Sequence, residues 1–372
     1  MKEGWEIVNI GSICNIITGK LDANASSENG VYPFFTCSRE SLKIDNYAYD
    51  CECVLIAGNG DLNVKYYKGK FNAYQRTYIV TLKNDIKDVS VKYIFKFFEK
   101  YVEKLRQLSV GGVIKYIKLG DLTNAKIPVP PLSEQEKIVA ELDCLSGIIE
   151  KKKQQLKELD SLAQSIFYEM FGDPVENEKG WEIEKLGNKA NISSSNRIFA
   201  NEYTDTGIPF YRGKEITEKS KGNPISVELY ISKERYTEIK LNYGIPSVGD
   251  ILVTAVGTIG NIWVVDSEEP FYFKDGNVLW LKIKDSTNSI YFKYILTILI
   301  DKYKEMVANG CAYPALTIVN LKEMPTCITP LALQQQFANK IELIEKQKEL
   351  IKQSIKETET LFDSRMDYYF NS

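Results

Sequence analysis

The sequence predicts an α+β fold in which two similar strand-rich bodies are joined by two long antiparallel helices that form a coiled coil with pseudo-two-fold symmetry. Two repeated motifs and one repeated pattern support this prediction. The motif Gly4-Trp5-Glu6-Ile7 recurs as Gly180-Trp181-Glu182-Ile183, and a proline-marked segment at residues 127–135 is echoed at residues 324–334. A long charged stretch with heptad spacing follows each proline segment. Repeats in the same order indicate two copies of one structural plan.

The composition limits the chemistry that this chain can perform. It has 372 residues, a formal net charge of -3 and no histidine. Without imidazole, Ser-His-Asp and Cys-His catalysis, H-E-x-x-H zinc sites and the His/Cys zinc site of deaminases are excluded. The acidic balance argues against a protein that coats nucleic acid non-specifically. We expect a soluble, cytoplasmic protein, since the most apolar run, residues 294–300, is too short to span a bilayer.

Each body contains short apolar runs that end in glycine, which is typical of buried strands followed by tight turns. A second glycine, Gly60 or Gly260, then leads into another strand. Trp5 and Trp181 are expected to anchor the two cores. The predicted strands and helices are residues 53–58, 63–67 and 91–108 in the first copy, and residues 250–257, 261–265 and 289–307 in the second.

The hydrophobic period becomes helical after each proline segment. Ser133 is a candidate N-cap with Glu136 completing a capping box, and Gly172 followed by Pro174 marks the end of the first helix. Both stretches keep the same heptad positions, so the helices are expected to pair as a coiled coil about 55 Å long with one body at each end. The predicted helix-pairing residues are Ile138, Leu142, Leu145, Ile149, Leu156, Ile166, Phe337, Ile341, Ile344, Ile351, Ile355 and Phe362.

Motifs for catalysis or cofactor binding are not found. The nearest approach to a Walker A loop, residues 207–214, is followed by Glu215 where Ser or Thr is required. No G-x-G-x-x-G follows a predicted strand, and no Asn-Pro-Pro-aromatic methylase element occurs. Glu238-Ile239-Lys240 matches the E-x-K of metal-dependent nucleases, but so short a pattern is expected by chance. We therefore predict no catalytic, cofactor-binding or metal site in this chain.

Cations and aromatic residues are interleaved in both bodies. Residues 65–70 read Lys-Tyr-Tyr-Lys-Gly-Lys, and residues 211–214 read Tyr-Arg-Gly-Lys. Lys and Arg neutralise phosphates, whereas Gln, Asn and Arg can read base edges in the major groove. A solvated strand edge is the alternative, because edge lysines also prevent aggregation. The residues alone leave both interpretations open.

The motifs together resemble the specificity (S) subunit of type I restriction–modification systems. The resemblance is carried by the duplicated W-E-x-x-x-L/I-G motif, by the string I-P-V-P-P-L-S-E-Q-E-K-I-V at residues 127–139, and by the long helix that follows. It covers essentially the whole chain. The second copy departs from the pattern: residues 326–329 separate its prolines, and Gln334-Gln335-Gln336-Phe337 replaces E-Q-x-x-I.

This resemblance implies a non-catalytic subunit that binds double-stranded DNA. Each body would be a target recognition domain reading half of an asymmetric bipartite site, and the helices would set the gap between the halves. Partners would be two methyltransferase (M) subunits, which carry S-adenosylmethionine and methylate adenine N6, and two restriction (R) subunits that use ATP and Mg in phage defence. The implied domains are residues 1–131 (recognition domain 1), 132–172 (central spacer helix), 173–329 (recognition domain 2) and 330–372 (C-terminal spacer helix).

Residue type and loop position select the candidate DNA contacts, because the family motifs do not fix them. Two other kinds of function remain open: a nuclease or fused restriction–modification enzyme, and a coiled-coil adaptor that binds protein. A specificity subunit of a related class, with methylase and nuclease fused in its partner, is a closer alternative. The candidate DNA-binding residues are Asn59, Lys65, Tyr67, Lys70, Gln75, Arg76, Arg197, Arg212, Lys214, Thr258, Asn261 and Lys274.

Overall fold

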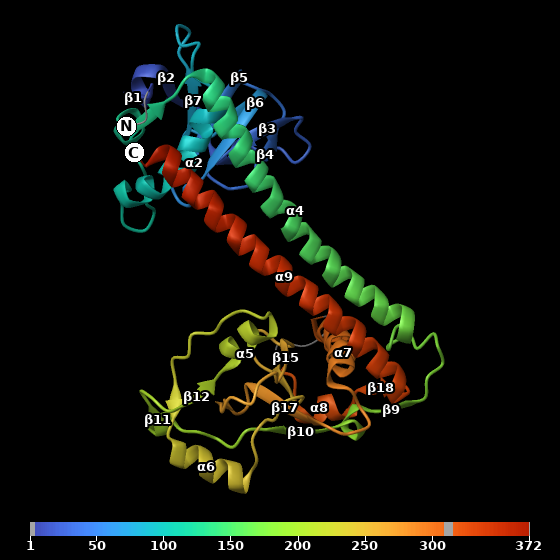
Figure 1. Cartoon of the computed structure of the whole chain (residues 1–372). Coiled ribbons are helices and arrows are strands. Elements are labelled where there is room, and N and C mark those ends of the chain that lie inside the picture. Colours follow the sequence, from blue (N-terminus) through green and yellow to red (C-terminus); the bar gives the residue numbers. More distant parts are fainter. Residues whose placement is uncertain (1–3, 309–314, 372) are drawn as a thin grey trace. The chain divides into compact units, whose positions relative to one another are not determined.

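The structure of the chain is a computed structural model that describes residues 4–308 and 315–371 (Figure 1). The chain forms two compact units: unit 1 comprises residues 1–155 and 351–372, and unit 2 comprises residues 156–350. Two continuous helices, α4 (Leu132–Phe171) and α9 (Leu331–Phe370), each contribute one half to either unit. Two strand-rich units with two long helices confirm the predicted fold class.

The repeated motifs of the sequence meet in a two-stranded sheet within each unit. In unit 1, β1 (Glu6–Asn9) of the W-E motif pairs antiparallel with β8 (Lys126–Val129) of the proline segment. In unit 2, β9 (Ile183–Lys185) pairs in the same way with β18 (Pro325–Cys327). The start and the end of each body are therefore joined immediately before a long helix begins.

Unit 1 is built on a six-stranded sheet that is packed on both faces. Val54 and Ile56 of its central strand join the larger core, with helix α2 (Val91–Leu108) and Trp5, whereas Cys53 and Leu55 join a smaller aromatic core on the opposite face. All strand pairs are antiparallel except β3 with β6. In sheet order the strands are β2 (Cys14–Thr18), β7 (Thr77–Leu82), β5 (Tyr49–Ala57), β6 (Val64–Ala73), β3 (Tyr32–Phe35) and β4 (Leu42–Ile44), and the helices are α1 (Ile10–Ile13), η1 (Ala23–Ala25), α2 (Val91–Leu108) and α3 (Leu119–Thr123).

Unit 2 repeats this arrangement with two four-stranded sheets. Ile251 and Val253 of its central strand join a core with helix α7 (Ser289–Ala308), and Trp181 packs against this core. Leu252 joins a second core with helices α5 (Gly213–Ser220) and α6 (Lys233–Asn242). One sheet contains β10 (Ala190–Ser194), β17 (Val278–Ile283), β14 (Ile251–Thr254) and β15 (Ile262–Val264). The other contains β11 (Tyr203–Thr204), β13 (Tyr230–Ile231), β12 (Ile208–Tyr211) and β16 (Tyr272–Phe273), and the helices are η2 (Leu186–Asn188), η3 (Ala200–Glu202), α5 (Gly213–Ser220), α6 (Lys233–Asn242), α7 (Ser289–Ala308) and α8 (Ile318–Glu323).

The second body is longer because it contains an insertion between equivalent strands. Between β12 and β14 the chain forms α5, β13 and α6, whereas between β3 and β5 it forms only β4. The strands and helices predicted from the sequence are all found, but β6 extends to Ala73 rather than Tyr67. Its polar second half is stabilised by pairing with β5, where Lys68 faces Glu52 with an Nζ–Oε2 distance of 3.1 Å. The predicted strand ended too early because residues 68–70, Lys-Gly-Lys, lack the apolar pattern of a strand.

A buried glutamine, rather than the predicted Ser133 cap, organises the start of each long helix. Ser133 lies inside α4, which begins at Leu132, so the N-cap prediction was wrong. Gln135 accepts a hydrogen bond from Ser90 N (2.9 Å) and donates from Nε2 to Asp88 O and Pro130 O (2.8 Å each). It thereby ties the first turn of α4 to the residue that precedes α2.

The second copy uses Gln334 in the same way. This side chain accepts from Asn288 N (2.8 Å) and donates to Thr329 O (2.9 Å), so the first turn of α9 is tied to the residue that precedes α7. Gln135 and Gln334 are 0% and 1% exposed. The second copy therefore keeps two of the three hydrogen bonds that Gln135 makes in the first, although its proline segment differs.

The long helices run antiparallel within each unit. In unit 1, Arg365 of α9 pairs with Glu141 of α4 (Nε–Oε1 2.5 Å), and Lys152 Nζ donates to Ser354 Oγ (2.5 Å). In unit 2, Lys348 pairs with Asp160 (Nζ–Oδ1 2.7 Å). Seven of the predicted helix-pairing residues are buried and five are half-buried: Ile138, Leu142, Ile149, Phe337, Ile341, Ile344 and Ile355 in the first group, and Leu145, Leu156, Ile166, Ile351 and Phe362 in the second.

The predicted end of the first helix is confirmed. α4 ends at Phe171, and Gly172 follows with φ +75° and donates from its backbone N to Tyr168 O (2.8 Å). A residue with a positive φ at this position is the usual terminator of a helix. The apolar run at residues 294–300 lies inside α7. Within residues 4–308 and 315–371, no helix combines the length and apolarity that crossing a membrane requires.

Candidate nucleic-acid interface

Three connections between strands lie together in unit 1. They are residues 36–40 after β3, residues 58–65, which form the β5–β6 turn and the first two residues of β6, and residues 74–76 between β6 and β7. We call these residues the first loop cluster. Four of the six candidate DNA-binding residues predicted for the first body belong to it: Asn59, Lys65, Gln75 and Arg76.

Hydrogen bonds fix the first loop cluster. Gly58 N donates to Arg76 O (2.8 Å), and Cys37 Sγ donates to the same carbonyl (3.5 Å). Asn63 Nδ2 donates to Cys37 O (2.8 Å). Gly58 leaves no room for a side chain, since a Cβ there would lie 2.4 Å from Arg76 O. The three connections are therefore held as one unit, which presets the positions of the side chains that they carry.

Lys65 and Tyr67 serve the structure of this region. Lys65 Nζ donates to Ser38 O (2.7 Å) and to Asn63 Oδ1, and its half-buried position lowers its pKa by desolvation of the ammonium. The Tyr67 ring packs on Phe35 with centroids 5.0 Å apart. Neither side chain is free to act as a simple phosphate contact. Lys70 is exposed, outside the first loop cluster, with Nζ 4.6 Å from the centre of the Tyr47 ring.

Gln75 and Arg76 are the exposed residues of the first loop cluster that are candidates to contact DNA base edges. Among the residues that the structure describes, neither side chain has a hydrogen bond or ion pair, whereas their backbones are bound to Leu21 and Gly58. A guanidinium or amide on a fixed backbone can bind a base edge at little entropic cost. Arg39 was not among the predicted DNA contacts; it lies in the same cluster and pairs with Asp61 (2.8 Å) on the surface.

In unit 2, two of the predicted cations are already neutralised. Arg212 Nη2 lies 2.9 Å from Glu215 Oε1 and 2.7 Å from Glu228 Oε2, and Lys214 Nζ lies 2.7 Å from Glu228 Oε1. Hydrogen bonds from Lys214 and Arg212 lower the pKa of Glu228 to about 2. Hydrogen bonding to Glu215 and then Glu228 raises the pKa of Arg212. Arg212 also stands at the N-cap of α5, where Glu215 accepts from its backbone N (2.8 Å).

Arg197 and Lys274 meet at one carboxylate. Arg197 Nε donates to Asp275 Oδ2 (2.8 Å), and Lys274 Nζ lies 3.7 Å from Asp275 Oδ1. Lys274 N donates to Tyr211 O (2.8 Å), which places this group beside the residue that precedes Arg212. The four cations predicted in unit 2 therefore gather around the ends of β12 and β16.

Thr258 and Asn261 form a closed turn beside α5. Asn261 Nδ2 donates to Thr258 O (2.8 Å) and to Thr217 Oγ1 of α5 (3.2 Å). The amide of Asn261 is thus engaged within the protein, while the Thr258 side chain is exposed and lies 3.4 Å from Thr217 Oγ1. We use the name second loop cluster for these four cations, for Glu228 and for the turn at residues 258–261. The four cations are Arg197, Arg212, Lys214 and Lys274.

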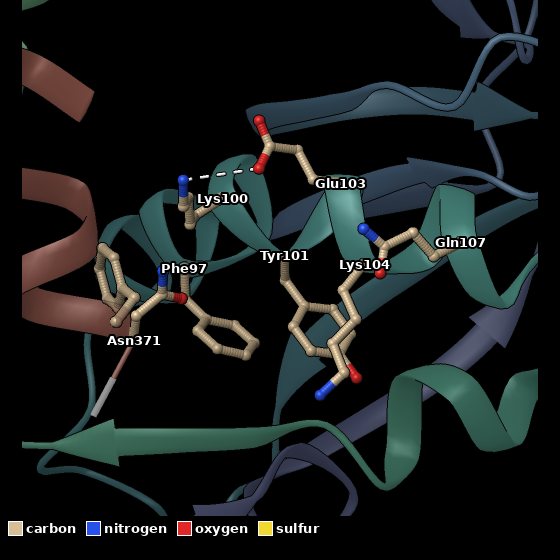
Figure 2. A pocket seen from close by; sticks show the side chains of 8 residues that line it. Phe97, Lys100, Tyr101, Glu103, Lys104, Gln107 and Asn371 are labelled. Carbon is tan, nitrogen blue, oxygen red and sulfur yellow. Dashed lines mark ion pairs between the residues drawn. The ribbon is translucent and has the colours of Figure 1, made fainter. Parts of the chain in front are cut away.

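None of the predicted DNA-binding residues lines the main cavities among residues 4–308 and 315–371. One cavity of about 230 Å³ in unit 1 lies between α2 and the end of α9 and is lined by Phe97, Lys100, Tyr101, Lys104 and others; Figure 2 shows the Lys100–Glu103 ion pair at its wall. No group of three or more His, Cys, Asp or Glu residues that could hold a metal ion occurs in the described part of the chain. The candidate site is therefore a pair of loop surfaces rather than a pocket.

A family model described as "Type I restriction modification DNA specificity domain" matches this chain twice, at residues 2–160 and 178–360. The chain belongs to this family. The two matched regions correspond to the two copies recognised in the sequence, and the family resemblance predicted there is confirmed.

Relatives of this specificity-subunit family cover different parts of the chain. The type I restriction enzyme EcoDI specificity subunit of Escherichia coli is 37% identical over 158 residues, which are 42% of this chain and 35% of that protein. A putative type I restriction enzyme specificity subunit of Haemophilus influenzae is 26% identical over 350 residues, 90% of this chain and 86% of that protein. The type I system S subunit crystal structure from M. genitalium has the same fold, with a TM-score of 0.60 at 17% identity, covering 98% of this chain and 96% of that one.

Several polar residues of the specificity-subunit surface were not found by sequence reasoning. Glu228 is distant in sequence from the cations that it neutralises, and no local pattern marks it. Arg106 lies in the last turn of α2, and its Nη2 donates to Leu62 O (3.0 Å) of the first loop cluster. Lys115 belongs to a Gly-Gly-containing loop whose backbone binds Gly60. The Gly-Gly pair at residues 111–112 was a usable signal for this loop.

Proposed function

We propose that this chain is the sequence-reading subunit of a type I restriction–modification complex. In this proposal the first loop cluster reads one half of an asymmetric bipartite DNA site, and the second loop cluster reads the other half. One observation carries the proposal: the two units share a frame of paired motifs and helices but carry different loops on it. Two copies of one frame with different reading loops suit a site with two different halves.

The remaining features of the complex form part of the proposal. Residues 1–131 and 173–329 would be the recognition domains, and residues 132–172 and 330–372 the spacer helices that pair as a coiled coil and set the gap. Two M subunits and two R subunits would dock on this chain in the cytoplasm, and they would supply S-adenosylmethionine, ATP and Mg. The chain itself would bind DNA without catalysing a reaction.

An exchange of recognition domains tests the division of labour. Residues 173–329 would be replaced by the corresponding segment of a specificity subunit with a different target, in a complex with the same M subunit. We expect one half of the methylated motif to change while the other half is retained. The reciprocal exchange of residues 1–131 should change the opposite half. A motif in which both halves change with either exchange would contradict the proposal.

Arg76 is expected to read a base. Arg76→Ala should cost about 1–3 kcal/mol against one base pair of the first half-site and should relax the motif at that position, because an exposed guanidinium can bind guanine bidentately. Sequencing of methylated adenine sites measures the relaxation directly. Lys70→Ala is the matched control, since this exposed cation lies outside the first loop cluster. An unchanged motif with unchanged affinity for Arg76→Ala would remove this residue from the site.

Glu228 is expected to weaken DNA binding by occupying two cations. Glu228→Gln frees Lys214 for a phosphate and leaves Arg212 paired with Glu215 alone, so the slope of log K against log salt should steepen by about 1. Because Glu228 has a pKa of about 2, it stays charged from pH 5 to 8, and changing pH in that range should not mimic the substitution. Its stabilising ion pairs persist above the usual carboxyl pKa and are lost only as pH falls toward 2.

The control for this effect is Glu238→Gln on α6. Glu238 is similarly exposed and pairs with Arg235 (2.8 Å), so this variant removes the same charge from the same unit. Equal salt slopes for Glu228→Gln and Glu238→Gln would show that only net charge matters. That result would place Arg212 and Lys214 outside the DNA contact.

A further inference from the structure

Residues 109–117 of unit 1 form a closed loop with an apolar tip. Val110 N donates to Tyr116 O (3.0 Å), and Tyr116 N donates to Val110 O (2.8 Å), so the loop is closed at its base. Gly111 has φ +124°, and a Cβ there would lie 2.5 Å from Ile114 O. Only glycine fits this position, which fixes how the chain turns into the tip.

The tip exposes side chains that are normally buried. Val113 is 103% exposed and Ile114 is 62% exposed. Both belong to unit 1 and stand next to each other on a loop that is otherwise held firmly. Burial of exposed aliphatic side chains is favourable, so a partner that covers Val113 and Ile114 would gain binding free energy from their apolar surface.

The loop is attached to the first loop cluster. Gly60 N donates to Lys115 O (3.0 Å), and Ile117 N donates to Gly58 O (3.0 Å). Ile117 is 2% exposed, and its carbonyl accepts from Tyr78 OH (3.2 Å). The apolar tip is therefore held against the same turn whose backbone fixes Arg76.

The surroundings of the tip are basic, although the whole chain has a net charge of -3. The carboxylates of the first loop cluster, of the tip loop and of their immediate neighbours are Glu40, Asp61 and Asp121; Asp61 pairs with Arg39, and Asp121 accepts from Lys118 N (2.7 Å). This excess of positive charge complements a polyanion better than a protein surface. The cations of the first loop cluster, of the tip loop and of their immediate neighbours are Arg39, Lys65, Arg76, Arg106, Lys115 and Lys118.

We infer that Val113 and Ile114 are specificity-determining DNA contacts, which enter a groove of the half-site read by unit 1 and pack on base edges. This inference rests on the proposed function. In the major groove, aliphatic side chains distinguish thymine by contact with its methyl group. Inserted as wedges between base pairs, they favour base steps that unstack easily. Lys115 would neutralise a phosphate beside the tip. The rigid base of the loop limits the entropy lost on binding.

The experiment uses the full chain in complex with its M subunit and a duplex carrying the methylated motif. Val113→Ser/Ile114→Ser should weaken cognate binding by roughly tenfold or more and leave non-cognate binding within about twofold, since apolar burial near bases contributes to specific binding only. Val31→Ser is the matched control: this residue is 80% exposed and precedes β3, whereas the first loop cluster follows the other end of that strand. Val113→Ala/Ile114→Ala provides a second, smaller truncation.

Two further readouts separate the outcomes. 2-Aminopurine placed at each step of the half-site reports whether a base step unstacks, and fluorescence that falls in the double variant supports a wedge. Full cognate affinity in both double variants would overturn the inference while leaving the proposed function intact. Loss of M-subunit assembly instead of DNA affinity would overturn it in favour of a protein contact. A wild-type complex without any preference for the motif would overturn the proposed function itself.

Discussion

Gln135→Ala is expected to destabilise unit 1 by about 2 kcal/mol, because it removes three hydrogen bonds to the backbone, one of them buried and two part-buried. Ser90 N would lose its acceptor, and Asp88 O and Pro130 O would lose their donor. Gln135 is 0% exposed and Pro130 is buried, so water cannot reach Pro130 O without opening the structure, whereas Ser90 and Asp88 lie nearer the surface. A cavity of several side-chain atoms adds to the cost.

The measurement is thermal unfolding together with amide hydrogen exchange of the M-bound chain. Exchange should accelerate at the start of α2 and of α4, the two helices that this side chain connects. Gln155→Ala is the control, because it makes the same change on the same helix at an exposed position. If Gln135→Ala unfolds at the same temperature as Gln155→Ala, the glutamine is not a structural tie.

Lys96→Met is expected to destabilise unit 1 by about 1–3 kcal/mol, since the cation is buried whereas its partners Glu99 and Asp143 are partly exposed. Lys96 is 4% exposed on α2, and its Nζ lies 3.0 Å from Glu99 Oε2 and 2.9 Å from Asp143 Oδ1 of α4. The substitution keeps the apolar stem but leaves the Glu99 carboxylate without its cation. Calorimetry of the variant measures the loss.

The pH dependence identifies the cause of this loss. Burial raises the pKa of Glu99, and Lys96 opposes that rise. A carboxyl with a raised folded-state pKa favours the folded state when protonated, and this contribution is lost as pH rises through that pKa. The deficit of Lys96→Met should therefore be largest at neutral pH and should shrink as pH falls toward the usual carboxyl value. The double variant Lys96→Met/Glu99→Leu should recover most of the stability, and a double variant that is as unstable as the single one would contradict this explanation.

Periodicity and repetition sufficed to predict the frame. The α2 span was predicted as it is found, Val91–Leu108, since its apolar spacing is local. Pairing of β1 with β8 was beyond the sequence argument, because Ile7 and Pro128 meet only after the whole body has folded. The Ser133 prediction failed for a related reason: a distant buried partner, the segment before α2, makes Gln135 the organising residue instead.

The candidate interface was less predictable than the frame. Residue type drew attention to Arg76, which is exposed on a fixed turn. It could not distinguish this residue from Lys65, whose ammonium is used inside the protein, or from Arg212, which Glu228 neutralises. Charge in a sequence shows where cations are plentiful, but their availability depends on carboxylates that the fold brings from elsewhere.

The most direct test of the central claim is adenine methylation mapping by long-read sequencing. The chain would be co-expressed with its M subunit in a host that lacks adenine methylation, and each gene would also be expressed alone. The proposed function predicts one asymmetric bipartite methyladenine motif that appears only when both genes are present. A motif that is identical without this chain, or no motif although the same M subunit is active with another specificity subunit, would contradict it.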